Sequence, residues 1–222
     1  MNAHALPAPL PVSWRMKGLT SAPVARADIL EDGRLHLSLV HDVVHGVTPE
    51  MIVWWYENVE GDAELEGSPV PKYRLWHPRD HVSFRYVRRA PDGGAGAGAI
   101  FHIVEAFGRN PAYLLDVDLH VARLDEGGFV HRPRPHGLPL ARADYAFERV
   151  AGGTRYVNSL TFGLAGRALR PLNALLVRAI FPVARGRAWL LHNIEEVGNW
   201  EHFLPQLFTA ARAGRNAHLS AA

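Results

Sequence analysis

Residues 187–204 read RAWLLHNIEEVGNWEHFL, and this stretch decides the fold. Apolar and charged side chains recur in it every three or four positions, at Trp189, His192, Glu196, Trp200 and Phe203. This spacing predicts a helix that turns one continuous stripe toward a partner layer. We expect the helix to span residues 187–204, with Pro205 kinking or ending it.

The partner layer is predicted from segments in which apolar and polar residues alternate. The expected strands cover residues 34–40, 73–77, 81–89, 99–108, 113–123, 143–150 and 154–162. A shorter helix is expected to begin after Thr48, because Pro49 at the first position and Glu50 in the first turn favour a helix start, and to end near residue 58. An antiparallel sheet followed by a long C-terminal helix predicts an α+β fold, with the helix laid across the sheet.

The composition is that of an ordinary globular protein. The 222 residues are 48% hydrophobic and 21% charged, which excludes a largely disordered chain. Cysteine is absent, which excludes disulfide scaffolds and thiolate metal sites. The net charge of +2 comes from scattered arginines, so nucleic acid is not an expected partner.

We expect a proline-rich extended arm over residues 1–24 and a single catalytic domain over residues 25–222. The first residues lack the charged start and apolar run of a signal peptide, and no run of 18 apolar residues follows. We therefore expect a cytoplasmic protein without stable membrane insertion. The Arg-flanked helix expected over residues 169–183 leaves a membrane-surface role open, although a lid or core helix explains its apolar side more simply.

Three places put a titratable residue on an inward face. In the strand over residues 99–108, alternation places Glu105 in line with Phe101, Ile103 and Phe107. A buried carboxylate needs a partner, which could be an arginine or a metal; an exposed strand end is the other reading. His77 shares a predicted strand face with Tyr73 and Leu75, and alone it would be read as a structural histidine.

His192 and Glu196 are four residues apart, so their side chains reach the same point beside the helix. Alone, this pair could be a simple ion pair within the helix or a polar contact between the helix and the sheet. Taken with His77 and Glu105, it provides two imidazoles and two carboxylates, a set suited to catalytic zinc, iron or manganese. His81 follows His77 by four residues and is expected to support the metal site or to donate a proton. His131 and His136 lie in a proline-rich segment, where we expect exposed side chains.

Three motifs resemble the family of 2,4-diacetylphloroglucinol hydrolase and phloretin hydrolase. They are HDVVHGVTPEMIVWW at residues 41–55, YRLWHPRDH at residues 73–81 and HNIEEVGN at residues 192–199. The resemblance implies a helix-grip fold like that of START proteins and birch pollen allergens, a curved antiparallel sheet around a long C-terminal helix. It also implies one zinc ion per chain, held by His77, Glu105, His192 and Glu196, with His81 as the candidate catalytic proton donor.

The family's activity implies hydrolysis of the carbon–carbon bond between an acyl group and a phenolic ring, as in polyphenol degradation. The expected partner is therefore an acylphenol or a related ketone, handled by a monomer or a homodimer. Trp76, Trp189 and Trp200 are candidates for lining a flat phenolic pocket, or they belong to the core. Two alternatives remain open, a noncatalytic carrier of a hydrophobic aromatic ligand and a metal-dependent ester or lactone hydrolase.

Overall fold

A curved antiparallel sheet and one long helix make up most of the molecule. The computed structural model describes residues 6–214 and 217–219. Among these, nine strands form a sheet in the order β1-β2-β11-β10-β9-β8-β7-β6, with β3 beside β11. The strands are β1 (Val24–Ile29), β2 (Leu35–Val40), β3 (Val44–His45), β6 (His81–Arg88), β7 (Ile100–Ala106), β8 (Leu114–Asp125), β9 (Gly128–Pro133), β10 (Ala141–Val150) and β11 (Gly153–Phe162).

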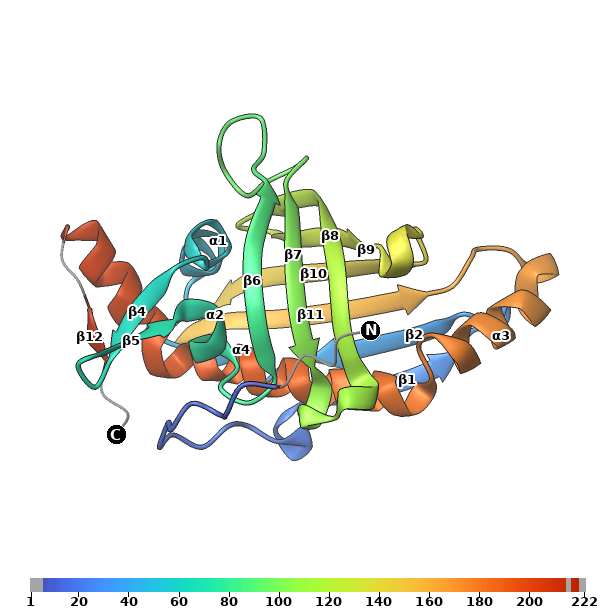
Figure 1. Ribbon diagram of the computed structural model, residues 1–222, viewed down its shortest axis with the longest axis horizontal. Helices are drawn as coiled ribbons and strands as arrows, with labels where there is room; N and C mark the ends of the chain where they lie inside the picture. Colours follow the sequence, from blue (N-terminus) through green and yellow to red (C-terminus); the bar gives the residue numbers. More distant parts are fainter. Residues whose placement is uncertain (1–5, 215–216, 220–222) are drawn as a thin grey trace.

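Figure 1 shows the sheet curving around helix α4 (Val183–Arg212). This arrangement confirms the predicted α+β helix-grip fold. The remaining helices are α1 (Pro49–Asn58), α2 (Lys72–Trp76) and α3 (Arg170–Ala179). The short 3-10 turns are η1 (Leu19–Ser21), η2 (Phe107–Arg109), η3 (Pro111–Tyr113), η4 (Pro135–Gly137) and η5 (Arg167–Leu169). A small second sheet joins β4 (Asp62–Leu65), β5 (Ser68–Pro71) and β12 (His218–Leu219). None of the described helices combines the length and the apolar character needed to span a bilayer.

Local signals in the sequence account for several elements. The Thr48 hydroxyl accepts a hydrogen bond from the Met51 amide at 3.3 Å, which caps α1 as predicted. Leu35, Leu37 and Leu39 alternate in β2 and are fully buried beneath α4. Gly186 allows the helix to approach closely, since a β-carbon there would lie 3.0 Å from the Leu37 side chain.

Two predicted boundaries differ from the structure. Helix α4 begins earlier than residue 187 and continues through Pro205 to Arg212. Proline removes one backbone hydrogen bond, but packing of the buried face against the core outweighs this local cost. Strands β1 and β9 were not predicted. Each lies against neighbouring strands of the main sheet, and those pairings order segments whose own alternation is weak.

The structure corrects the prediction for residues 73–77. It was predicted as a strand, but Lys72–Trp76 forms the short helix α2 and His77 is its C-terminal cap. Alternation over five residues cannot distinguish a strand from one helical turn, because both place the first and last side chains on the same face. As a result, His77 and His81 do not point to the same side, as described below.

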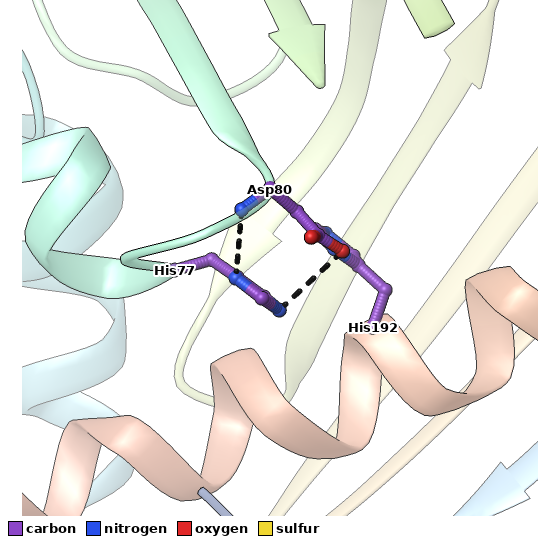
Figure 2. Close-up of side chains that lie close together, drawn as sticks. All are labelled: His77, Asp80 and His192. Carbon is purple, nitrogen blue, oxygen red and sulfur yellow. Dashed lines mark hydrogen bonds and ion pairs between the residues drawn. The ribbon is translucent and has the colours of Figure 1, made fainter. Parts of the chain in front are cut away.

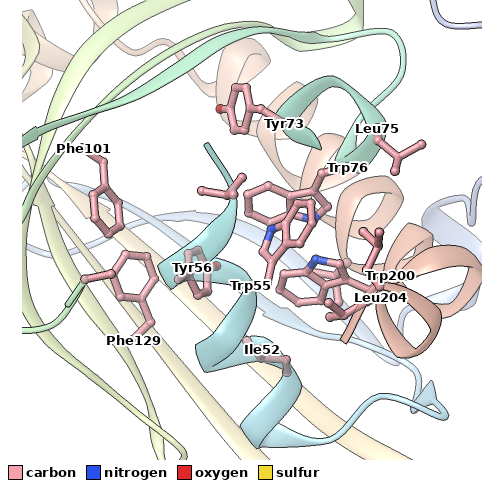
Figure 3. Packing of buried hydrophobic residues seen from close by; sticks show 14 of the residues in the cluster. Ile52, Trp55, Tyr56, Tyr73, Leu75, Trp76, Phe101, Phe129, Trp200 and Leu204 are labelled. Carbon is pink, nitrogen blue, oxygen red and sulfur yellow. The ribbon is translucent and has the colours of Figure 1, made fainter. Parts of the chain in front are cut away.

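The apolar core has two parts, and α4 passes through both. One part surrounds Trp55, Trp76 and Trp200, where Trp76 stacks on Trp200 with ring centres 5.2 Å apart (Figure 3). The other contains the β2 leucines together with Trp189 and Leu190. The turn of α4 that bears His192 and Glu196 lies at the junction of the two parts. The polar side chains of that turn therefore enter the interior.

The described part of the predicted N-terminal arm runs outside this core. The Leu10 amide donates to the Pro78 carbonyl at 3.0 Å, and Trp14 stacks on His202 with ring centres 5.4 Å apart. Residues 1–5 of the predicted arm lie outside the described residues. The arm thus contacts both α4 and the loop that precedes β6.

Candidate metal centre

Four buried side chains from β6, β7 and α4 face one point. His81 is the first residue of β6, and Glu105 lies opposite it on β7 in the antiparallel register. His192 and Glu196 project from successive turns of α4. All four side chains are buried, with relative exposures of 1%, 7%, 2% and 8% in that order.

The distances within this cluster match those of a tetrahedral metal site. His81 Nε2 lies 3.5 Å from Glu105 Oε1 and 3.4 Å from Glu196 Oε2. His192 Nε2 lies 3.6 Å from Glu105 Oε2 and 3.7 Å from Glu196 Oε2. Nitrogen and oxygen ligands bind zinc at about 2.0–2.2 Å, so in a tetrahedron they lie roughly 3.3–3.6 Å apart. His81, Glu105 and His192 each offer a donor atom within 4.8 Å of the other two, and Glu196 Oε2 lies beside both histidines, so the cluster could hold one ion.

Hydrogen bonds fix both imidazole rings with Nε2 free for a metal. His81 Nδ1 lies 2.7 Å from the Tyr73 carbonyl oxygen, which can only accept, so the hydrogen is on Nδ1. His81 Nε2 is buried and has no hydrogen-bond partner within the described chain. His192 Nδ1 is likewise 3.1 Å from Asp80 Oδ2. A lone buried acceptor facing two carboxylates is what a missing cation would explain.

His77 lies next to His192 but outside the four-residue cluster. The Asp80 amide donates to His77 Nδ1 at 3.2 Å, which leaves the hydrogen on Nε2. This Nε2–H faces Glu195 Oε2 at 3.2 Å, and the ring stacks on His192 with centres 4.5 Å apart. Figure 2 shows His77 and His192 on either side of Asp80. His77, Asp80 and His192 thus satisfy one another as a hydrogen-bonded network, whereas the four-residue cluster does not.

The structure places Glu105, His192 and Glu196 beside His81, while His77 lies in a neighbouring group with Asp80 and His192 whose donor atoms are also close enough to hold a metal. His81, the predicted proton donor, donates its Nδ1–H to the Tyr73 carbonyl in this structure, so its Nε2 faces the cluster. The physical reason is α2, whose single helical turn directs His77 toward Glu195 while His81 enters β6.

Asp80 is the residue that the sequence analysis missed. Its carboxylate accepts from the Gly108 and Arg109 amides at 2.7 and 3.1 Å, as well as from His192. Burial alone would raise the pKa of Asp80, but these hydrogen bonds and the charge of His192 lower it to about 2. The only signal in the sequence was the position of this aspartate directly before His81. Adjacent residues share no face of a strand or a helix, so this position did not indicate that Asp80 belongs to the site.

Burial disfavours the charged forms of the two cluster carboxyls. Burial and the neighbouring Glu105 together raise the pKa of Glu196 to about 8, although the charge of His192 opposes the shift. Burial also raises the pKa of Glu105. Burial would lower the pKa of His192, but the Asp80 hydrogen bond and the two glutamates raise it to about 9. The metal-free site therefore retains protons that a metal ion would displace.

This retention predicts how the metal-free protein responds to pH. Between about pH 7.5 and 9 the folded chain keeps protons on His192 and, up to about pH 8, on Glu196 that the unfolded chain releases, so the free energy of unfolding should fall as pH rises. His41, His77, His81 and His131, whose pKa values burial lowers, are neutral in the folded chain and become largely neutral in the unfolded chain only above about pH 7.5, so they add little slope in this window. Urea midpoints measured with a chelator should decline over this window, and zinc should remove the decline. A chelator-treated protein that gains stability with pH would contradict the site.

A cavity of about 100 Å³ opens beside the cluster. Its walls are mainly aromatic and aliphatic, and they include Trp76 and Trp189 of the three predicted tryptophans; Trp200 packs behind Trp76 instead. The Tyr73 ring lies parallel to His81 with centres 3.9 Å apart, and its hydroxyl donates to Glu105. The cavity therefore has a flat apolar interior with the polar cluster in one wall.

His131 also lines the cavity, contrary to the expectation that it is exposed. Pairing of β9 with β8 and β10 turns its side chain inward, where it is 4% exposed. Its Nε2 lies 3.2 Å from the Tyr145 hydroxyl, and its buried Nδ1 has no partner among the residues described. His136, on η4, is exposed as expected.

Comparison with known proteins gives one family match. Residues 28–133 match the model of the DAPG hydrolase PhiG domain. This segment contains α1, the loop with His77 and Asp80, and the strands that carry His81 and Glu105. Curated proteins include no match in sequence.

Solved structures resemble the chain only distantly. Ara h 8.0201 is 11% identical, covers 72% of this chain and 95% of its own, and has a TM-score of 0.37. A START superfamily protein from Mycobacterium smegmatis is 11% identical, covers 69% of this chain and 97% of its own, and has a TM-score of 0.41. The di-domain ARO/CYC StfQ from the steffimycin biosynthetic pathway is 14% identical, covers 83% of this chain and 54% of its own, and has a TM-score of 0.45. The match over residues 28–133 covers just under half of this chain and supports a relationship to the DAPG hydrolase family.

Proposed function

We propose that this protein is a zinc-dependent hydrolase that cleaves the carbon–carbon bond between an acyl group and a phenolic ring. The family domain indicates a hydrolase. The observation that supports metal dependence is the pair of imidazole Nε2 atoms, each of which lies 3.4–3.7 Å from two buried carboxylate oxygens.

His81, Glu105, His192 and Glu196 would hold one ion. When bound, zinc would supply a Lewis acid for the acyl carbonyl and would acidify a water molecule. Asp80 holds the His192 ring through Nδ1, and the Tyr73 carbonyl holds the His81 ring in the same way. These bonds orient both rings so that their Nε2 atoms are aimed at the same point, where a bound metal would replace any hydrogen. His77 supports Glu195 and Asp80 in this arrangement rather than binding the ion.

The cavity suits a flat phenolic ring. Its apolar walls exclude water, while His131 and Tyr145 offer polar atoms for ring hydroxyls. Burial lowers the pKa of His131 to about 3 and raises that of Tyr145 well above 10, so both side chains stay neutral and act as hydrogen-bonding groups. Phenolic hydroxyls would satisfy the unpartnered His131 Nδ1.

The net reaction consumes one water molecule. Its oxygen joins the acyl carbon, and the carbon–carbon bond breaks with the electron pair moving to the ring carbon. Ring hydroxyls stabilise that charge through their keto tautomers, and a proton then completes the ring C–H bond. The products are a carboxylic acid and the deacylated phenol.

Elemental analysis and product analysis together test the proposal. Untagged protein should contain about one zinc per chain, and the His192→Ala/Glu196→Ala variant should contain none. With an acylphloroglucinol in ¹⁸O-labelled water, the label should enter the carboxylic acid and the phenol should lose its acyl group. Hydrolysis of esters or lactones without C–C cleavage would contradict the reaction. Absence of metal after zinc is supplied, with tight binding of the intact phenol, would indicate a carrier.

A further inference from the structure

Two segments that are distant in sequence contribute partly exposed side chains to the cavity wall, and we place the mouth of the cavity between them. Pro133 and Pro135 line it from the loop between β9 and β10, and Ile180 and Phe181 line it from the connection between α3 and α4. Figure 1 shows α3 and the loop after β9 toward the same end of the molecule. Whatever enters the cavity here passes between these segments.

Both segments are rich in arginine and free of acidic residues. The chain has 22 aspartates and glutamates, but residues 127–143 and 163–194 contain none, and together they carry eight arginines. Seven of these arginines are exposed; Arg142 pairs with Asp144 and Arg167 with Glu31, whereas within the described ranges no ion pair involves the other five, Arg132, Arg134, Arg170, Arg178 and Arg187. The mouth is therefore framed by positive charge that the described chain does not neutralise.

The same segments expose leucines. Leu138 is 50% exposed, Leu172 42% and Leu175 61%, and they are half of the large hydrophobic side chains that the described chain exposes. Helix α3 buries Asn173 and Val177, so its outer face carries Leu172 and Leu175 beside Arg178. Apolar side chains interleaved with arginines form a surface that water solvates poorly on its own.

We propose that this docking rim, defined as Arg134, Leu138, Arg170, Leu172, Leu175 and Arg178, binds an anionic phospholipid surface with the cavity mouth facing the bilayer. Leucines of an interfacial helix insert among the acyl chains, while arginines contact phosphate groups. A second copy of the chain fits less well, because a symmetric dimer would oppose two rims of the same charge. Docking would let an apolar ligand pass from lipid into the cavity without crossing water.

Vesicle sedimentation of the full chain tests this inference. The protein should pellet with equimolar phosphatidylcholine and phosphatidylglycerol, bind phosphatidylcholine alone far more weakly, and be released by high salt. Each arginine near an anionic surface contributes about fivefold, so Arg170→Glu/Arg178→Glu should weaken binding roughly 25-fold or more. Leu172→Ser/Leu175→Ser should weaken it about tenfold.

Two exposed residues outside the rim provide matched controls, Leu19→Ser on η1 and Arg149→Glu beside the β10–β11 turn. Both should bind vesicles as the parent does. Equal binding to neutral and anionic vesicles would overturn the proposal, as would rim variants that bind like the controls. Sedimentation velocity adds a third test: a parent dimer that the leucine variant converts to a monomer would show that the rim is a subunit interface.

Discussion

Replacing His81 with alanine is expected to remove the bound metal and to reduce hydrolysis by about 10³-fold or more, because a Lewis acid contributes several kcal/mol to such a reaction. The reason is geometric. His81 Nε2 is a buried acceptor that lies 3.4–3.5 Å from the two ligand carboxylates, and its other nitrogen is occupied by the Tyr73 carbonyl. The measurement is metal content per chain together with turnover of an acylphenol.

His77→Ala is the matched control for this variant. His77 is also fully buried and also stacks on an aromatic ring, that of His192 where His81 stacks on Tyr73, so its removal creates a comparable cavity. Because its ring nitrogens bond to Asp80 and Glu195 and it touches the cluster only through this stacking, the variant should keep one metal per chain, with affinity lowered by roughly 10- to 100-fold at most. Loss of metal from His77→Ala and retention by His81→Ala would restore the assignment that the family motif implied.

Asp80→Asn is expected to weaken zinc affinity by about 10- to 100-fold. The substitution keeps the shape of the side chain and an oxygen that can accept from the Gly108 amide, but it removes the negative charge that holds the Nδ1–H of His192. The loss should therefore appear as a weaker zinc affinity in competition with a chelator, with only a modest change in the metal-free melting temperature.

Asp116→Asn serves as the control for Asp80→Asn, because its side chain is half exposed on β8 and pairs with His102 rather than with the cluster. Its zinc affinity should equal that of the parent. If Asp80→Asn binds zinc as tightly as the parent does, then the bond between Asp80 and His192 does not orient the ligand.

Features with a local periodic cause could be predicted from the sequence. The Thr48 cap with Pro49 after it, the inward face of Glu105 and the four-residue spacing of His192 and Glu196 all follow from fixed backbone geometry. Where the pattern was short or interrupted, prediction failed. Five residues before Pro78 were too few to distinguish α2 from a strand, and the weak alternation of β9 concealed the inward turn of His131.

The sequence by itself therefore determined the long helix, the antiparallel sheet and the kinds of side chain available for a metal. Which histidine joins the cluster was decided only by the tertiary structure. The hydrogen on each ring nitrogen is set by an acceptor elsewhere in the chain, the Tyr73 carbonyl for His81 and the Asp80 carboxylate for His192. Asp80 and His192 lie 112 positions apart, and only folding of the sheet around α4 brings them into contact.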